Sequence, residues 1–300
     1  PPLRLFSGAS PETVAEDLAV LVDFRPEGMS LAELGALVED RLLPHLMRYD
    51  LPSFQGLFNS GLEEGAAYGA HLALDWNQGV TNWQVSPGGA TLEELCCQAL
   101  CRLFTLGPEA DATVLYSGTY ANQQGLYMAL CHRAEAEGFE FAARGLAGFP
   151  DPGRLKVAVS ADAHFSVRHG VRFLGLGEDS LIRIGVDENR RLSVDRLHDA
   201  FGGLEDGDEI FCVVAPAGTT STGSVDPVEE IAHLCQENGA WLHVDGAYGL
   251  AYGLVPEKAP LFRGMDRAHS ISWDPHKQMG VPIPNSILFA RSRELFRPMA

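Results

Sequence analysis

The chain has 300 residues, of which 46% are hydrophobic and 21% charged, a composition typical of a globular protein with one large or two smaller domains. Its net charge of −18 argues against nucleic-acid binding, because phosphate contacts need a basic surface. No apolar run reaches the roughly 18 residues of a membrane span, and the first residues contain no apolar export signal. We therefore expect a cytoplasmic protein with no nucleic-acid or membrane partner.

The six cysteines contain no Cys-x-x-Cys pair. Cys97 and Cys101 are four residues apart and would share one face of a helix. A zinc site would need further ligands at close spacing, and the sequence around this pair offers none. We expect buried, reduced thiols and no metal site.

The first 85 residues predict helices and loops. Apolar residues recur at helical spacing over 11–24 and 30–49, with Ser10 and Ser30 as N-caps. Pro44 is expected to kink or end the second helix. We interpret this part as an N-terminal helical segment, residues 1–85, followed by a large domain over residues 86–300.

The junction between these two parts contains a loop, a break and a helix start. Residues 50–60 read as a loop with exposed aromatic side chains. Pro-Gly-Gly at 87–89 is expected to break the chain. Thr91 and Glu94 then form a capping box that opens an amphipathic helix to about Leu106.

Beyond this point apolar strands alternate with helices. The predicted strands are 112–117, 156–161, 181–186, 209–216, 241–247, 270–274 and 287–291. The predicted helices are 119–137, 166–174, 193–201 and 226–238, the last with Asp226 as N-cap. This order predicts an α/β fold with a mostly parallel sheet covered by helices on both faces. In such sheets ligands bind beyond the carboxyl ends of the strands.

Two residues at such strand ends suggest pyridoxal phosphate chemistry. Lys277 follows the strand at 270–274, and Asp245 closes the strand that begins at Trp241. A lysine amine forms a Schiff base with the cofactor aldehyde, and an acid keeps the pyridine nitrogen protonated so that the ring accepts electrons. Taken singly, each residue also fits an ordinary solvated loop position.

Other strand ends supply residues that suit the same ligand. Tyr-Ser-Gly-Thr at 116–119 joins a strand to a helix and would make a phosphate cup from free amides and hydroxyls. His164 could stack on a flat ring, and His276 could assist phosphate binding beside Lys277. Ala-Gly-Thr-Thr at 217–220 offers close backbone approach. Individually, each motif is also typical of an ordinary structural feature: the first of a helix cap, the histidines of buried hydrogen-bonded side chains, and the last of a turn after a strand.

The order of these motifs resembles the group II pyridoxal phosphate-dependent amino-acid decarboxylases. These include the glutamate, aromatic-amino-acid, histidine and cysteine-sulfinate decarboxylases of fold type I. The likeness rests on the phosphate cup, Ala-His-x-Ser, Ala-Gly-Thr-Thr, His-Val-Asp-x-Ala and Pro-His-Lys, in that order. It covers most of the chain, beginning with Arg-Leu-Leu-Pro-His-Leu at 41–46.

The resemblance implies a role for each residue around the cofactor ring. Lys277 would form the Schiff base, and Asp245 would pair with the pyridinium nitrogen. His164 would stack on one face of the ring and Ala247 would pack on the other. Thr220 would lie close to Asp245 and the ring.

The resemblance also implies the phosphate and substrate contacts. The residues expected to hold the phosphate are Ser117, Gly118, Thr119 and His276. Asp226 would support the site from the start of its helix. Residues 81–86, with Trp83 and Ser86, would face the substrate, which could belong to the neighbouring subunit of a homodimer. A mobile loop and a small C-terminal domain, both absent from this chain, would complete the enzyme.

Three positions depart from the family's pattern. Asp274 stands where family members often have asparagine, and an acid near a phosphate is unfavourable unless it is protonated or points away. We therefore do not assign Asp274 to phosphate binding. Tyr116 replaces the first serine of the usual cup, and Pro-Gly-Gly at 87–89 replaces Pro-Ala-Ala, which leaves specificity open.

The expected function is decarboxylation of an L-amino acid to its amine and CO₂ through a Schiff base on Lys277. An aldolase-type carbon–carbon lyase shares the Asp-x-His-Lys pattern, although the stretch 83–94 favours the decarboxylases. Oxidative deamination to an aldehyde is a third possibility. A non-catalytic pyridoxal phosphate-binding protein is a fourth. The sequence does not identify the amino acid.

Overall fold

The computed structural model describes residues 4–23, 26–56 and 58–299. The chain divides into two compact units, Pro1–Gly61 and Leu62–Ala300. The division falls earlier than the expected boundary between residues 85 and 86. The reason is a helix that the sequence analysis did not predict, α3 (Glu64–Trp76), which belongs to the larger unit. The amide of Glu63, just before α3, donates to the carbonyl of Gly280 at 2.9 Å.

The smaller unit contains short helices. The first is α1 (Pro11–Leu18), which continues as a 3-10 turn at Ala19–Val22. The second is α2 (Leu31–Leu37), which continues as a π-helical turn at Val38–Leu42 and a 3-10 turn at Leu43–His45. Both expected N-caps are confirmed, because Ser10 Oγ accepts from Thr13 N and Ser30 forms a capping box with Glu33. Residues 24 and 57, which belong to the first predicted helix and to the predicted aromatic loop, lie outside the described residues.

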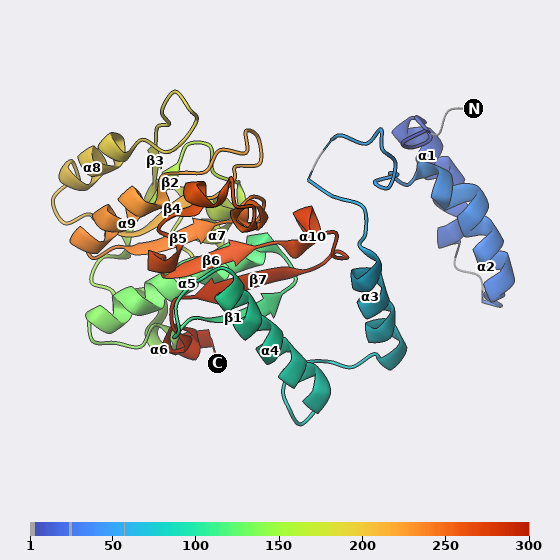
Figure 1. The fold of residues 1–300 in the computed structure, drawn as a ribbon, viewed down its shortest axis with the longest axis horizontal. Coiled ribbons are helices and arrows are strands. Elements are labelled where there is room, and N and C mark those ends of the chain that lie inside the picture. Colours follow the sequence, from blue (N-terminus) through green and yellow to red (C-terminus); the bar gives the residue numbers. More distant parts are fainter. Residues whose placement is uncertain (1–3, 24–25, 57, 300) are drawn as a thin grey trace. The chain divides into compact units, whose positions relative to one another are not determined.

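The larger unit is built on a seven-stranded sheet in the order β1-β7-β6-β5-β4-β2-β3 (Figure 1). The strands are β1 (Asp111–Leu115), β2 (Leu155–Ser160), β3 (Leu181–Ile184), β4 (Glu209–Pro216), β5 (Trp241–Asp245), β6 (Ser270–Trp273) and β7 (Ser286–Ala290). Only β7 runs antiparallel to its neighbours among the paired strands described. All seven predicted strands are confirmed, with ends shifted by at most a few residues.

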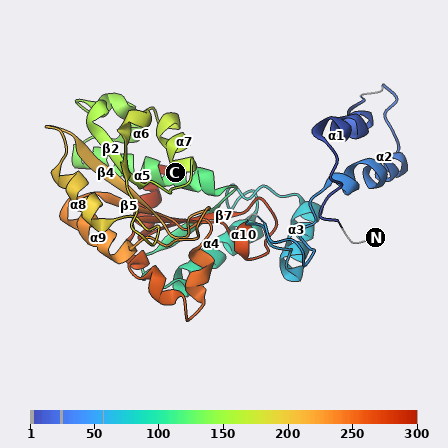
Figure 2. The ribbon, with the colours of Figure 1, turned by 90° about the horizontal axis from the view of Figure 1, so that it is seen from above.

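Helices cover both faces of the sheet, as expected for strands that are apolar on both sides. Figure 2 shows α5 (Gly118–Ala136), α6 (Phe141–Arg144) and α7 (Ser166–Phe173) on one side of the strands. It shows α8 (Val194–Gly202) and α9 (Val228–Glu237) on the other. Each side has its own buried apolar cluster. The four helices predicted after residue 118 are therefore confirmed.

Two predicted helix starts are wrong. The helix expected to open at Thr91 is α4 (Pro87–Leu103), which begins four residues earlier, and Thr91 Oγ1 donates to the Pro87 carbonyl instead of capping. Proline suits the first turn because its missing N–H would have no partner there. In α9 the N-cap is Pro227. Asp226 points elsewhere, and its Oδ1 accepts from the amide of Leu192 at 2.8 Å.

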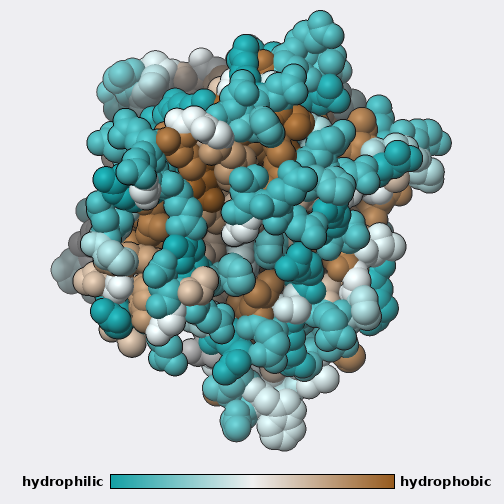
Figure 3. Space-filling model, turned by 90° about the vertical axis from the view of Figure 1, so that its left-hand side faces the viewer, coloured by the Kyte–Doolittle hydropathy of each residue, from teal (hydrophilic) through white to brown (hydrophobic). Residues whose placement is uncertain are grey.

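The face shown in Figure 3 is covered mainly by hydrophilic side chains, with hydrophobic ones visible between them. Within the described ranges, no helix combines the length and apolarity needed to cross a bilayer. Of the six cysteines, all free, only Cys96 is exposed. Burial raises the pKa of the Cys97 thiol to about 12. In the part of the chain that the structure describes, no cluster of three or more His, Cys, Asp or Glu side chains is arranged to hold a metal.

Candidate active site

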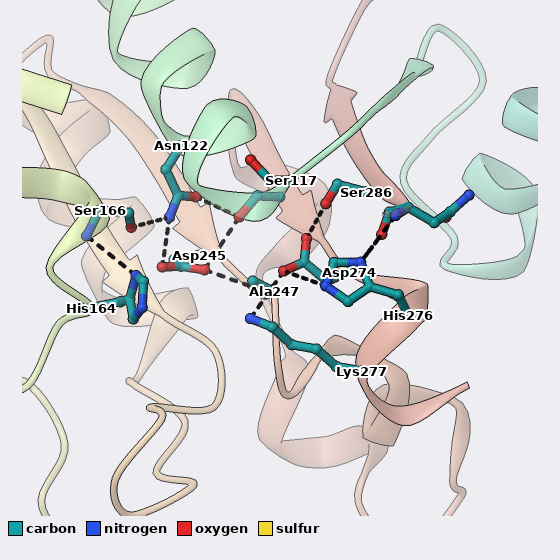
Figure 4. A network of polar contacts seen from close by, with 12 residues as sticks. Ser117, Asn122, His164, Ser166, Asp245, Ala247, Asp274, His276, Lys277 and Ser286 are labelled. Carbon is teal, nitrogen blue, oxygen red and sulfur yellow. Dashed lines mark hydrogen bonds and ion pairs between the residues drawn. The ribbon is translucent and has the colours of Figure 1, made fainter. Parts of the chain in front are cut away.

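The predicted site residues meet at one edge of the sheet. Strands β2, β5 and β6 are parallel, and β1 runs in the same direction because both β1 and β6 are antiparallel to β7. Their carboxyl ends therefore lie at the same edge. The residues that follow them there are Ser117, His164, Asp245 and Lys277 (Figure 4).

Lys277 lies on α10 (Pro275–Gln278), a single turn that follows β6. Its Nζ is 2.9 Å from Oδ2 of Asp274, a residue that is only 3% exposed. The hydroxyl of Ser286, the first residue of β7, donates to the other oxygen of the same carboxylate. The amine of Lys277 is thus held at the sheet edge by a buried acid whose orientation is fixed.

Asp274 also lies against the start of α5. A Cβ added to Gly118 would come 2.5 Å from Asp274 Oδ2, so only glycine leaves room for this carboxylate. Ser117 is the N-cap of α5, and its Oγ accepts from the amide of Tyr120 at 3.2 Å. Among the described residues, the amides of Gly118 and Thr119 have no recorded acceptor. A helix start with free amides is an anion-binding position.

His276 lies beside this helix start. Its Nδ1 contacts the backbone of Asn285, and its Nε2 is 3.9 Å from Asp274 Oδ2. The side chain is largely buried. The imidazole is therefore positioned near the expected phosphate position, with its second nitrogen directed at the same carboxylate that holds Lys277.

Asp245 is a buried carboxylate surrounded by neutral donors. Asn122 Nδ2 donates to Oδ2 at 2.8 Å, while the Ala247 amide and the Ser272 hydroxyl approach Oδ1 at 3.2 and 3.3 Å. No ion pair with a lysine, arginine or histidine is recorded for Asp245 in the described structure. Because a buried carboxylate is stable only when its charge is compensated, this position suits a cationic group on a ligand.

A set of buried polar residues behind Asp245 was missed by the sequence analysis. They are Asn122 on α5, Ser166 on α7, Trp241 and His243 on β5, and Ser270 and Ser272 on β6. The strand sequences did indicate such a set, because polar residues stand two apart, at 243 and 245 and at 270 and 272, within otherwise apolar segments. Residues at this spacing point to the same face of a strand. The helix partner, Asn122, has no comparable signal.

His164 lies near the charged residues of the site. Burial lowers its pKa, and the charges of Asp245, Lys277 and Asp274 all act on it. Its Nδ1 accepts from the amide of Ser166 at 3.2 Å, so the proton of the neutral ring is on Nε2. The structure therefore places a neutral, half-buried imidazole within electrostatic reach of both the lysine and the aspartate.

Four predicted residues are not brought into this cluster. Thr220 is exposed, and the hydrogen bonds recorded for Asp245 in the described residues do not include it. Trp83 is 64% exposed. Ser86 is buried, but its hydroxyl donates to Gln78 at 2.7 Å. Asp226 is 1% exposed and contacts Leu192 rather than the cluster.

The residues fit pyridoxal phosphate at three points. Lys277 offers an amine, Asp245 offers a buried carboxylate held by neutral donors, and the start of α5 offers amides for which the described residues supply no acceptor. A Cβ on Gly218 would meet the backbone of Gly249 at 2.5 Å, so these glycines let the segments after β4 and β5 pack directly against each other. One feature opposes the phosphate, namely the carboxylate of Asp274 against Gly118.

This sheet topology with a lysine and an aspartate at its carboxyl edge defines the class of fold type I pyridoxal phosphate proteins. Residues 21–298 match the pyridoxal-dependent decarboxylase conserved domain, and the chain belongs to that family. The family and cofactor expected from the sequence are confirmed at this level.

Several relatives are decarboxylases. The chain is 30% identical to the L-2,4-diaminobutyrate decarboxylase of Rhizobium meliloti (strain 1021) over 99% of its own length and 57% of the relative. It is 29% identical to human cysteine sulfinic acid decarboxylase over 91% of its length and 54% of that protein. It thus spans a little over half the length of these curated relatives.

Solved structures show the same fold. The glutamate decarboxylase domain of diaminobutyrate-pyruvate transaminase and L-2,4-diaminobutyrate decarboxylase from Vibrio parahaemolyticus matches with a TM-score of 0.93 and 26% identity, covering 99% of this chain and 64% of that one. Mouse CSAD in apo form matches with a TM-score of 0.89 and 27% identity, covering 98% and 60%. The expectation of a fold type I architecture is confirmed.

Proposed function

We propose that the full protein decarboxylates an L-amino acid to its amine and CO₂ with pyridoxal phosphate. The observation that carries this proposal is the convergence of Lys277 and Asp245 on His164, from three different strand ends. Membership of the decarboxylase family supports the reaction class.

When bound, pyridoxal phosphate supplies an aldehyde that joins amines covalently and a ring that accepts the electron pair of a broken bond. Lys277 would provide the amine for attachment, and in the structure this amine is paired with Asp274 at 2.9 Å. Asp245 would hold a proton on the ring nitrogen, because its buried carboxylate is bound only by neutral donors in the described site. The positive charge kept on that nitrogen would stabilise the negative charge that develops when a carboxylate is lost.

His164 supplies a neutral ring with a proton at Nε2. Because burial lowers its pKa, the imidazole stays uncharged near neutral pH and can lie against a flat aromatic ring. Ala247, which is buried and whose amide donates to Asp245, would pack on the other face of the ring. Ser117, Gly118, Thr119 and His276 would bind the phosphate with backbone amides, hydroxyls and an imidazole.

The substrate proposal is a small polar L-amino acid. It rests on the relatives, whose names give 2,4-diaminobutyrate and cysteine sulfinate as their substrates. The test is to incubate the full-length protein and pyridoxal phosphate with these two amino acids, glutamate and aromatic L-amino acids, recording CO₂ and amine. Stoichiometric CO₂ and amine from one substrate supports decarboxylation. Aldehyde formation points to the synthase chemistry, a carbonyl product without CO₂ points to the lyase, and no turnover points to a binding protein.

We further propose a cytoplasmic homodimer. Large apolar side chains are exposed on α3 and α4, including Leu74 and Trp76 at 74% and 70% and Leu92 at 62%. Such exposure on two consecutive helices is typical of an interface. Residues 81–86, with Trp83 and Ser86, would then approach the cofactor of the neighbouring subunit. This placement accounts for the exposure of Trp83 in a single chain.

A further inference from the structure

Behind Asp245 lies a continuous chain of buried hydrogen bonds that runs the length of β5. Trp241, His243 and Asp245 alternate along this strand and so share its α5 face. Ser270 and Ser272 of β6 lie beside His243 and Asp245 in register. The five side chains form one polar row on a face that is otherwise apolar.

Helix α5 approaches this row unusually closely. A Cβ on Gly125 would come 2.4 Å from Nδ1 of His243, so the glycine lets the helix lie directly over the imidazole. One turn earlier, Asn122 reaches the strands with both ends of its amide. Its Oδ1 faces His243 Nε2 at 2.9 Å and Ser272 Oγ at 2.6 Å, and its Nδ2 faces Asp245 at 2.8 Å.

The hydrogen bonds in this row can all run in one direction. At one end, the indole of Trp241 can only donate, and it donates to Ser270 Oγ at 3.0 Å. This bond leaves the proton of the Ser270 hydroxyl available for Nδ1 of His243, 2.8 Å away, when the imidazole carries its own proton on Nε2.

At the other end, the Asp245 carboxylate can only accept, so Asn122 must turn its NH₂ group toward it. The amide oxygen of Asn122 is then left to accept from His243 Nε2, which puts the proton of the neutral imidazole on Nε2 and lets Ser270 donate to Nδ1. The donor sequence runs from Trp241 through Ser270, His243 and Asn122 to Asp245 without a conflict.

The row is also electrically neutral behind Asp245. His243 is fully buried, and burial lowers its pKa to about 4 in spite of the opposing effect of the Asp245 charge. A positively charged imidazole here would partly neutralise Asp245 and weaken its attraction for a cation on a ligand. A neutral imidazole does not, so the Asp245 carboxylate can interact at full strength with a cationic ring nitrogen.

We propose that His243 and Asn122 are positioning residues that orient the Asp245 carboxylate toward the cofactor ring nitrogen through this one-directional row of hydrogen bonds. The proposal rests on the proposed function, because it gives Asp245 its role in cofactor binding. Without His243, the Asn122 oxygen would keep only Ser272 Oγ of its two donors, and the amide that donates to Asp245 would be held less firmly.

The test compares the dissociation constants of two probes, pyridoxal phosphate and its analogue with carbon in place of the ring nitrogen, on the full-length protein. The measured quantity is the preference for the nitrogen-containing ring. In His243→Phe, which keeps a flat ring but has no donor, this preference should fall about tenfold or more, the size expected for a hydrogen bond that supports a buried charge. Ser270→Ala, a milder change, should lower it in the same direction. His243→Gln, which retains a donor and an acceptor, should largely restore it.

The control is Val244→Ala, which removes fully buried volume from the opposite face of β5. It should lower thermal stability and leave the preference unchanged. In an Asp245→Asn background, His243→Phe should have no further effect. An unchanged preference in folded His243→Phe and Ser270→Ala, or additivity with Asp245→Asn, overturns the inference. A wild-type protein that binds both probes equally, or neither, instead overturns the assignment of Asp245 and with it the proposed function.

Discussion

The Lys277 amine is paired with the carboxylate of Asp274 at 2.9 Å, three residues earlier in the chain. The same carboxylate lies against Gly118 at the start of α5, where a phosphate is expected to bind. A negative charge at this point repels a phosphate and also holds the lysine that must react with the cofactor aldehyde. Asp274 therefore opposes cofactor binding in two ways.

We expect Asp274→Asn to bind pyridoxal phosphate more tightly, by about tenfold or more, because one like charge near the phosphate is removed. Asparagine can still accept from Ser286. Absorbance titration of the protein with cofactor measures the effect, and Asp199→Asn, at a highly exposed side chain, is the control. Weaker binding in Asp274→Asn would show instead that Asp274 mainly keeps Lys277 in position.

Covalent attachment of the cofactor should map to Lys277. The chain has only two other lysines, Lys156 and Lys258. Lys156 donates to the Gly153 carbonyl near the start of β2, at the opposite edge of the sheet, and Lys258 is exposed in a turn. Borohydride reduction of the loaded protein followed by peptide mapping should place the pyridoxyl group on Lys277. Label on either other lysine would contradict the site.

Asp245→Asn should keep the cofactor bound but lower turnover by orders of magnitude. Asparagine has the same shape, yet it lacks the charge that holds a proton on the ring nitrogen. Steady-state kinetics with the amino acid that proves active in the substrate panel, alongside the cofactor content of the purified variant, separates the two effects. Near-normal turnover would mean that another group partners the ring nitrogen.

The fold was predictable from the sequence because its strands are short apolar runs separated by clear turns. The position of Asp245, Lys277 and His164 at one edge of the sheet was predictable because each lies at or just after the end of such a strand. The start of α4 was not, since Pro-Gly-Gly at 87–89 reads as a break although proline is favourable in a first helical turn. Asn122 was not predictable either, because its contacts with β5 and β6 join residues more than 100 positions apart.

Asp226 should make stability depend on pH. Burial raises the pKa of this carboxyl to about 7, and its Oδ2 has no hydrogen-bond partner among the described residues. The unfolded chain loses this proton near its ordinary pKa of about 4. The folded state is therefore progressively destabilised between about pH 4 and 7, and the penalty is complete above the folded pKa.

Asp226→Asn removes that penalty while keeping an oxygen for the Leu192 amide. We expect it to raise the free energy of unfolding by on the order of 2–4 kcal/mol above pH 7, at about 1.4 kcal/mol per pH unit, and to have little effect near pH 4. Denaturant unfolding at a series of pH values measures this difference. A constant difference at all pH values would show that ionisation of Asp226 is not its cause.

The exposed tryptophan of the 81–86 segment should act on a neighbouring subunit. Trp83 is 64% exposed, so Trp83→Ala should leave the stability of a single chain nearly unchanged. If the chain forms a two-fold dimer with residues 81–86 near the partner's cofactor, the same change should weaken substrate binding, seen as a higher KM. Light scattering on the full-length protein at micromolar concentration should give a dimer mass. An active monomer would refute the shared site, because no second subunit would be there to supply Trp83. A Trp83→Ala variant with unchanged KM would also refute it, because Trp83 would then make no contribution to substrate binding.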